Sequence, residues 1–407
     1  MKRMKQSPTD GRFVQNPYPF YHQARSTGDF VFWEDYGLPM AVTHEAVSAV
    51  LRHKSMGREI PPGKRKPVRA GLEAFYKLED SSMLELEPPA HTRLRRLVLR
   101  EFTRNRVLVM APEISMISDQ LISEFPKGEF DLLDAYARRL PVIVIARLLG
   151  VPEEMSDQLL DWSNKMVAMY QSRRTVEIEN EASNAAGEFA AFMRGYVEKR
   201  RASPRDDLIS QLIQAEAGGE KLSVDELIST CILLLNAGHE ATVHSLGNAV
   251  RHLIKHPLRE EAVHPDRIEY TVEECLRFDP PLHMFTRHVY EPVEMMGMSF
   301  KPGDEIGCLL GSACHDDAIW PDGDKFDPFR DIVPNVAFGA GIHFCVGAPL
   351  ARLEMQIALP TLFSRCPGIK LAEEPTVANL YHFRGLERLM VRCQEDGCVI
   401  PGELSST

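Results

Sequence analysis

The sequence predicts a mainly α-helical protein with small β-sheets, folded as one body. Apolar residues recur at three and four positions through most of residues 90–256, the spacing of helices with one buried face. No Gly/Ser-rich or Pro-rich linker divides the 407 residues. We therefore expect one domain over residues 1–407, with a minor β-containing part at about 1–85 and a helical body at about 86–407.

Short strands are expected in two places. Residues 30–43, FVFWEDYGLPMAVT, contain two apolar, aromatic-rich runs around a Gly-Leu-Pro turn. Residues 292–312 contain further short apolar runs, separated by a Lys-Pro-Gly-Asp turn at residues 301–304.

One predicted helix is long enough to cross the whole body. It begins at Ser223, where S-V-D-E forms a capping box with Glu226, and it runs to His256, just before Pro257. About 33 residues at about 1.5 Å each give a helix of roughly 50 Å. Further helices are expected at residues 272–278 and from Pro349 onward.

Charge and cysteine content narrow the kind of protein. The formal charge of −11 argues against general attraction to nucleic acid or anionic membranes. The basic start MKRMK is not followed by an apolar segment, so we expect no signal peptide, no membrane span and a cytoplasmic location. All eight cysteines lie between Cys231 and Cys398, without the spacings of a disulfide framework or a zinc site, so most should be reduced.

One cysteine lies in an unusual loop, FGAGIHFCVG at residues 338–347. Taken alone, a free cysteine is most often a small buried side chain. Here Gly339, Gly341 and Gly347 let the backbone approach a flat ligand, and the following helix directs its N-terminal dipole at Cys345. Both effects favour a thiolate, so we interpret Cys345 as a ligand.

The loop closely resembles the haem-binding loop of cytochromes P-450, and the resemblance extends over essentially the whole chain. It implies the family fold, a triangular helical prism enclosing haem b, with Cys345 as the thiolate ligand of the iron. It also implies that Phe338 shields the sulfur, that His343 bonds a haem propionate, and that Gly339 and Gly347 let the backbone approach the cofactor.

A second motif that fits the family is E-x-x-R in VEECLRF. Glu274 and Arg277 lie one helical turn apart, and such a pair is usually a surface ion pair worth roughly 0.2–0.5 kcal/mol. The resemblance instead implies a structural network with Arg330 of FDPFR, which locks the cysteine side of the haem.

Polar residues interrupt the middle of the long helix at AGHEAT, residues 237–242. Buried polar groups need partners, and Thr242 can bond back to the carbonyl of Gly238 and merely bend the helix. The resemblance offers another interpretation, the acid–alcohol motif of the family. Glu240 and Thr242 would then deliver protons to the reacting dioxygen.

Basic residues in EPPAHTRLRRLV are candidates for holding the haem propionates. His91 and Arg95 share a helix face, which without context is more often solvated. The resemblance implies a propionate clamp that also includes Arg287 and His343. The same region carries a basic cluster, either a solvated face or a docking surface for a ferredoxin-type electron donor. Its members are Arg93, Arg96, Arg100, Arg104 and Arg106.

The substrate pocket is expected in mostly apolar segments, at the places where the family has it. These are residues 56–83, the region of Met166, Met169 and Tyr170, the helix near Leu234, Ala237 and Gly238, the segment from Leu282 to Phe285, and the turn from Tyr381 to Phe383. A positively charged run either contacts an acidic substrate or is solvated. It consists of Lys64, Arg65, Lys66 and Arg69.

The implied reaction is monooxygenation of a small hydrophobic or aromatic molecule, with electrons from NAD(P)H through a ferredoxin and its reductase. We expect the enzyme to be a monomer. Two alternatives are a peroxide-driven haem-thiolate enzyme and a haem-binding sensor or carrier. The acid–alcohol pair argues against the first, because the use of peroxide bypasses that proton delivery, and an oxygen groove would be unnecessary in the second. Two departures from the family are Glu87, where Asp is usual before Pro-Pro, and the residues 314–317, where Asn-Arg-Asp-Pro is common.

Overall fold

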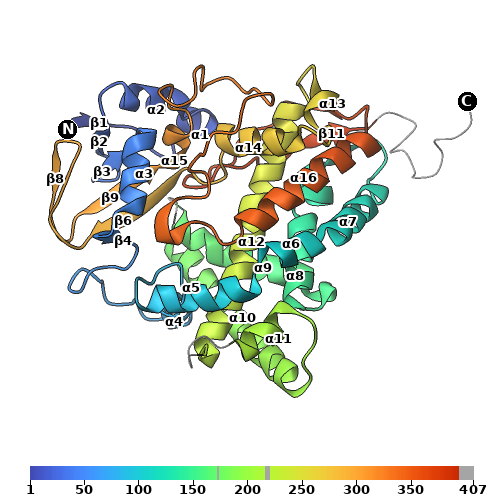
Figure 1. Cartoon of the computed structure of the whole chain (residues 1–407), viewed down its shortest axis with the longest axis horizontal. Helices are drawn as coiled ribbons and strands as arrows, with labels where there is room; N and C mark the ends of the chain where they lie inside the picture. The colour runs from blue at the N-terminus through green and yellow to red at the C-terminus, as the bar shows by residue number, and fades with distance from the viewer. Residues whose placement is uncertain (172–173, 216–220, 394–407) are drawn as a thin grey trace, which may run out of the picture.

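The structure, a computed structural model, describes residues 1–171, 174–215 and 221–393. Figure 1 shows a body of helices with a β-sheet at one side, near the N-terminus. The helices are α1 (Gly11–Gln15), α2 (Tyr18–Arg25), α3 (His44–Arg52), α4 (Glu73–Glu79), α5 (Ala90–Glu101), α6 (Arg104–Val109), α7 (Ala111–Ser123), α8 (Arg139–Leu149), α9 (Ser156–Val167), α10 (Val176–Ala202), α11 (Leu208–Gln214), α12 (Val224–Leu253), α13 (Arg259–Ala262), α14 (Ile268–Phe278), α15 (Leu310–Ala313) and α16 (Ala348–Arg365).

Helix α12 is the long helix predicted from the sequence. Its capping box is present: the Ser223 side chain accepts from the Glu226 N–H, and Glu226 Oε2 accepts from the Ser223 N–H at 2.8 Å. It contacts α8, α9, α10, α14 and α16, so it lies at the centre of the helical body. The helix ends at Leu253 rather than His256, because the chain turns ahead of Pro257.

The largest sheet combines strands from the N-terminal part of the chain with two strands that lie more than 200 residues later. Its order is β1-β2-β3-β9-β6-β4, and a three-stranded sheet β10-β11-β5 and a hairpin β7-β8 complete the β structure. The strands are β1 (Lys2–Met4), β2 (Phe30–Trp33), β3 (Leu38–Ala41), β4 (Met56–Gly57), β5 (Glu129–Asp131), β6 (Met284–Val289), β7 (Val293–Met295), β8 (Met298–Phe300), β9 (Glu305–Leu309), β10 (Lys370–Leu371) and β11 (Met390–Arg392).

Both predicted strand regions are confirmed, with one shift. Leu38 and Pro39 belong to β3, and the turn lies earlier, where the Gly37 N–H donates to the Trp33 carbonyl at 2.9 Å. The reason is local: Gly37 has a φ of 65°, which glycine adopts without strain. The β6 and β9 strands pair with each other and with β4 and β3, so the N-terminal β region is not a separate unit.

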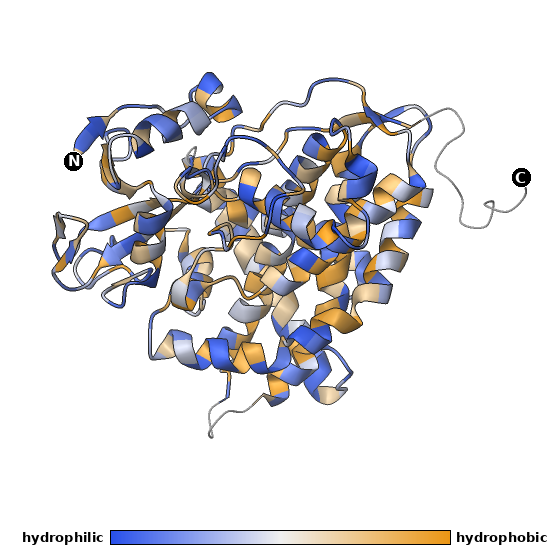
Figure 2. Ribbon diagram, turned by 45° about the horizontal axis from the view of Figure 1, so that its top comes forward, coloured by the Kyte–Doolittle hydropathy of each residue, from blue (hydrophilic) through white to orange (hydrophobic). Residues whose placement is uncertain are grey.

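Hydrophobic and hydrophilic residues alternate along most of the helices (Figure 2), and many of the hydrophobic ones are buried in the core. One large core cluster includes Leu140, Phe189, Leu246 and Met355. A smaller cluster packs the N-terminal helices against the sheet. Among the cysteines that the structure describes, six are free, as the sequence predicted for most of them: Cys231, Cys275, Cys308, Cys314, Cys345 and Cys393.

Candidate active site

Cys345 lies in a tightly turned loop immediately before α16. A 3₁₀ turn, Gly341–His343, comes before it, and the Cys345 N–H donates to the Phe338 carbonyl at 3.1 Å. Gly339 and Gly341 have φ angles of 69° and 73°, in the left-handed region that favours glycine. The glycines of the motif therefore bring the backbone around the thiol.

The backbone groups at the start of α16 favour a thiolate, as expected, but burial of the thiol acts more strongly against it. Burial raises the pKa of Cys345 and outweighs the backbone N–H groups of Gly347 and Ala348 and the charges of Arg95 and Arg352, which lower it. These protein groups therefore lower the free-energy cost of a thiolate at Cys345, but they do not deprotonate the thiol by themselves. A coordinated metal ion deprotonates such a thiol outright.

Phe338, predicted to shield the sulfur, is held by a residue that the sequence analysis missed. The Arg352 guanidinium lies over the Phe338 ring, 4.6 Å from its centroid. The same guanidinium binds Glu273 through Nε and through Nη2, the latter at 3.2 Å. Arg352 is on α16, so the helix that follows Cys345 also fixes the ring beside it.

The predicted propionate clamp is brought together around His91. Its ring lies 4.4 Å from that of His343, and the charges of His343 and Arg95 both act on it. Arg95 donates to the Phe344 carbonyl at 2.6 Å, next to Cys345. Arg287 is buried, and its charge reaches Glu87 in the same group.

These groups fit the carboxylates of a haem. Both ring nitrogens of His91 are buried without a hydrogen-bond partner, which is costly unless a ligand supplies one. Burial lowers the pKa of His91 to about 4, assisted by the charges of His343 and Arg95. An excess of positive charge around an unpartnered imidazole suits an anionic ligand.

Glu87 belongs to this region, although the sequence marked it only as a departure from the family. Its Oε1 accepts from His343 Nε2 at 2.9 Å and from the Arg58 backbone N–H at 2.6 Å. Burial acts to raise the pKa of Glu87, but these contacts and the charge of Arg287 lower it overall. Glu87 therefore fixes the ring of His343.

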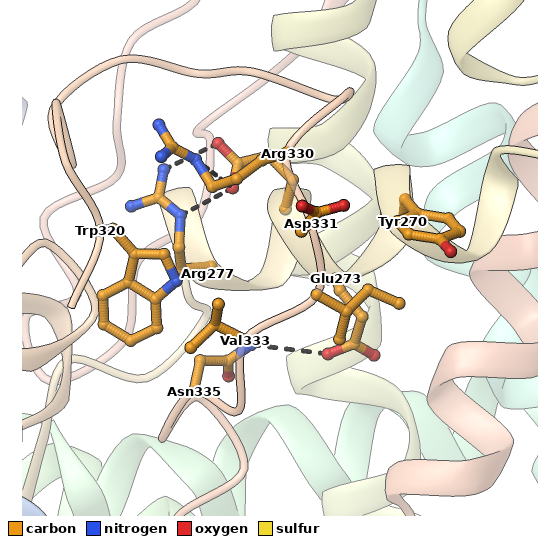
Figure 3. A pocket seen from close by; sticks show the side chains of 10 residues that line it. Tyr270, Glu273, Arg277, Trp320, Arg330, Asp331, Val333 and Asn335 are labelled. Atoms are coloured by element: carbon orange, nitrogen blue, oxygen red, sulfur yellow. Dashed lines mark hydrogen bonds and ion pairs between the residues drawn. The ribbon is translucent and has the colours of Figure 1, made fainter.

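The Glu274–Arg277–Arg330 network predicted from E-x-x-R is present, and its Glu274–Arg277 pair is buried. Arg277 donates twice to Glu274 at 2.7 Å, and each side chain is only 2% exposed. Arg330 Nε lies 3.6 Å from Glu274, and Figure 3 shows both guanidinium groups directed at the same carboxylate. The pair is thus a core element rather than a surface ion pair.

The residues of the AGHEAT segment in α12 differ in their exposure and in their contacts. Ala237 is exposed and Gly238 half-buried in a helix that is otherwise mostly covered, and a Cβ on Gly238 would lie 3.1 Å from Ile145. The Thr242 hydroxyl donates to the Gly238 carbonyl at 3.3 Å, the back-bond that the sequence allowed. Thr242 is only 3% exposed.

Glu240, the acid of the predicted pair, contacts two imidazoles. His239 Nε2 lies 3.4 Å from Oε2, and His244 Nε2 lies 3.2 Å from Oε1. Burial acts to raise the pKa of Glu240, but the two histidines overcome it and hold the pKa well below its usual range. The sequence analysis missed this role of His244, although its i+4 spacing from Glu240 is a readable signal.

The segments expected to line the substrate pocket lie close together in pairs. Leu282 and Phe383 form an isolated β-bridge. Asn236 Nδ2 of α12 lies 3.6 Å from the sulfur of Met166 on α9. A Cβ at Gly339 would lie 3.7 Å from the Phe285 ring, next to the cysteine loop. Two further members are buried, Leu234 and Met169.

The charged run in residues 64–69 is exposed, and two of its members are engaged by other residues. Arg65 pairs with Asp80, and Arg69 pairs with Glu179 at 3.0 Å. The less exposed cation of this region is Arg58, which pairs with Glu85 and was not singled out from the sequence.

The basic cluster lies on α5 and α6, on the cysteine side. Helix α5 reaches the cysteine loop through Arg95, and α6 contacts α16. Arg93 pairs with Glu226, and Arg106 lies 4.0 Å from Asp206, whereas Arg104 is exposed. The sequence did not anticipate that part of this charge is used within the chain.

The chain was compared with known proteins. The profile of the family described as Cytochrome P-450 matches residues 11–269 and 267–368. The cytochrome P-450 YjiB of Bacillus subtilis is 35% identical over 381 residues, covering 91% of this chain and 93% of that protein. The biotin biosynthesis cytochrome P-450 of the same organism is 33% identical over 399 residues, covering 95% and 98%.

Solved structures agree with these relatives. A crystal structure of P450BioI, in complex with acyl carrier protein ligated to hexadec-9Z-enoic acid, has a TM-score of 0.90 at 32% identity and covers 95% of this chain and 100% of that one. The fold and the loop define a haem-thiolate protein, and the chain belongs to the cytochrome P-450 family.

Family membership confirms the fold class and the cofactor expected from the sequence, which is haem with a cysteine thiolate as its axial ligand. It also confirms the expected class of enzyme, a P-450 monooxygenase. Over the part of the chain that the structure describes, none of the helices combines the length and the apolar character that a membrane span requires.

Proposed function

We propose that the protein inserts one atom of O₂ into a small hydrophobic or aromatic substrate, with two electrons delivered by a ferredoxin and its reductase from NAD(P)H. The observation that carries this proposal is the convergence of Cys345 with the partnerless imidazole of His91 and the charges of Arg95 and His343. A thiolate beside a carboxylate clamp suits haem and the activation of dioxygen.

The residues have separate roles in this proposal. Cys345 binds the iron, and His91, Arg95, Arg287 and His343 hold the two propionates. When bound, haem supplies the activation of dioxygen. The Phe338 ring, fixed by Arg352, limits the access of water to the sulfur.

Proton delivery is assigned to α12. Glu240 carries the protons, because it is the acid of the motif and two imidazoles are in contact with it. Thr242 assists by binding the Gly238 carbonyl, a contact that supports a positioning role. This arrangement favours a dioxygen-using enzyme over a peroxide-driven enzyme or a haem carrier, since neither alternative needs a buried proton path.

The electron donor is assigned to the cysteine side. An acidic ferredoxin suits the basic face formed by α5 and α6, and Arg104 is one of its exposed members. We expect Arg104→Glu to raise the KM for ferredoxin several-fold at low salt, with the effect shrinking as salt increases. Arg12→Glu on α1 is the matched control, and an equal effect there would contradict the assignment.

The substrate class rests on the apolar segments described above. P450BioI binds a fatty acyl chain presented on a carrier protein, which shows that one relative accepts an extended apolar molecule. A compound library screened for the low-spin to high-spin shift will identify binders. Turnover of a binder under ¹⁸O₂ with a ferredoxin and its reductase should label the product with one ¹⁸O atom, and an unlabelled product would refute monooxygenation. The cytoplasmic location and the monomeric state stay predictions.

A further inference from the structure

The carboxylate of Glu240 is held between two imidazoles that differ in their surroundings. His239 touches Oε2 at 3.4 Å, and its other nitrogen, Nδ1, lies 3.3 Å from the Leu235 carbonyl and 3.4 Å from the Ser163 hydroxyl. His239 is therefore anchored through Nδ1, whereas its Nε2 forms no hydrogen bond within the part of the chain that the structure describes. It has a polar neighbour at each nitrogen.

His244 is placed differently. Its Nε2 lies at an ion-pair distance of 3.2 Å from Glu240 Oε1 and forms no hydrogen bond among the described residues, and the side chain keeps 8% exposure. The Nδ1 edge faces the turn of residues 381–385, where a Cβ on Gly385 would come within 1.9 Å of Nδ1. His244 thus bridges Glu240 and this turn, which also carries Phe383 at 6.2 Å between ring centroids.

The other charged groups near this contact are already engaged. His239 is anchored as described, and Arg384 of the turn bonds Asp279 together with the backbone carbonyls of Val14 and Gln15. Glu240 is therefore the ionisable group that faces His244 among the described residues.

The hydroxyl of the predicted pair is turned away from this contact. Thr242 is 3% exposed, and its hydroxyl is bonded to the Gly238 carbonyl. Ala241, the half-buried residue next to Glu240 in the chain, carries no hydroxyl that could take its place. A carboxyl group that gives up a proton has to regain it from another group. An imidazole suits this task, since its proton exchanges in the physiological range.

We propose that His244 returns protons to Glu240, so that the relay in this chain is a carboxylate–imidazole pair. The proposal deepens the monooxygenase assignment and rests on it. In the step, the Nε2–H bond of the His244 imidazolium breaks and an O–H bond forms at Glu240 Oε1. The imidazolium becomes neutral imidazole, the carboxylate becomes a carboxyl group, and water then supplies the next proton to His244. His244 acts through Glu240 and is a positioning residue.

The test compares His244→Gln with His244→Phe. Glutamine keeps a hydrogen-bond donor for Glu240 but cannot release a proton, and phenylalanine keeps only the ring. Both variants should divert at least twice the wild-type fraction of NAD(P)H electrons into peroxide and show a larger solvent deuterium isotope effect. Wild-type coupling in His244→Gln would overturn proton transfer by His244.

Two further variants guard against a folding defect. Gly385→Ala keeps the imidazole of His244, but the added Cβ would crowd Nδ1 and displace the ring. This variant should therefore uncouple in the same direction. His252→Gln removes a histidine–carboxylate contact of similar length on the same helix, 3.1 Å to Asp279, and should not change coupling. In Glu240→Gln, adding His244→Gln should cause no further loss, and an additive loss would contradict a shared path.

A spectroscopic readout is independent of turnover. The ferrous carbon monoxide form is diamagnetic, so a downfield imidazole N–H proton resonance from His244 should be visible in the holoenzyme. It should vanish in His244→Gln, move in Glu240→Gln and stay in His252→Gln. A signal unaffected by Glu240→Gln would refute the contact. Wild-type protein without a thiolate-haem spectrum would instead refute the proposed function itself, so the two failures can be told apart.

Discussion

At the scale of single residues, the position of Thr242 decides what its hydroxyl can do. The hydroxyl bonds the Gly238 carbonyl at 3.3 Å, so its removal frees that carbonyl inside α12. We expect Thr242→Ser to couple like the wild type. Thr242→Val should produce more peroxide than the wild type but less than Glu240→Gln. Peroxide from Thr242→Val equal to that from Glu240→Gln would place the hydroxyl directly in the relay.

Residue types at fixed spacing made Cys345, Glu274 and Arg277 predictable from the sequence, and the structure gives their local surroundings. The contacts of Arg352 and Glu87 were not predicted, because their partners, Phe338 and His343, come from other segments. No local pattern reports a contact made by tertiary packing.

At the scale of an element, the cysteine loop depends on the conformation of Gly341. Its φ is 73°, and an added Cβ would lie 2.4 Å from the Leu51 carbonyl oxygen. Gly297 has the same φ of 73° with open space around it. Both Gly→Ala variants bear the backbone strain of about 1–2 kcal/mol. Only Gly341→Ala should also lose haem, measured by the ratio of Soret to protein absorbance; equal haem retention would contradict the steric argument.

The E-x-x-R helix supplies a second prediction at this scale. Glu274→Gln leaves the buried Arg277 charge without its partner, so we expect a loss of about 3–5 kcal/mol in the free energy of unfolding. Glu198 and Arg201 form an exposed pair at the same i,i+3 spacing, with side chains 59% and 38% exposed. Glu198→Gln should change stability little. Comparable losses in denaturant titrations of the two variants would show that burial does not set the energy.

At the scale of the whole molecule, two segments expected near the substrate meet through Glu79 at the end of α4. The Tyr170 hydroxyl donates to Glu79 Oε1 at 2.9 Å, joining residues 56–83 to the 3₁₀ turn Ala168–Tyr170 that follows α9. The sequence named both segments, but it could not reveal that a titratable contact joins them.

This contact predicts a dependence of stability on pH. Burial, together with the charge of Glu85, raises the pKa of Glu79 to about 8. The folded state thus holds the proton more tightly than the unfolded state, so the contribution is full below the unfolded pKa and is lost as pH rises through about 8. The melting temperature of the wild type minus that of Glu79→Gln should therefore decrease as the pH is raised from 5 to 9. A difference that stays constant over this range would refute the raised pKa of Glu79.

The central claim concerns the ligand that Cys345 provides. The measurement that tests it most directly is the absorption spectrum of the reduced protein under carbon monoxide, recorded for the wild type and for Cys345→Ala. The account predicts the red-shifted Soret band of thiolate-ligated haem in the wild type and its loss in the variant. A wild-type spectrum typical of histidine ligation, or a band that survives in Cys345→Ala, would contradict it.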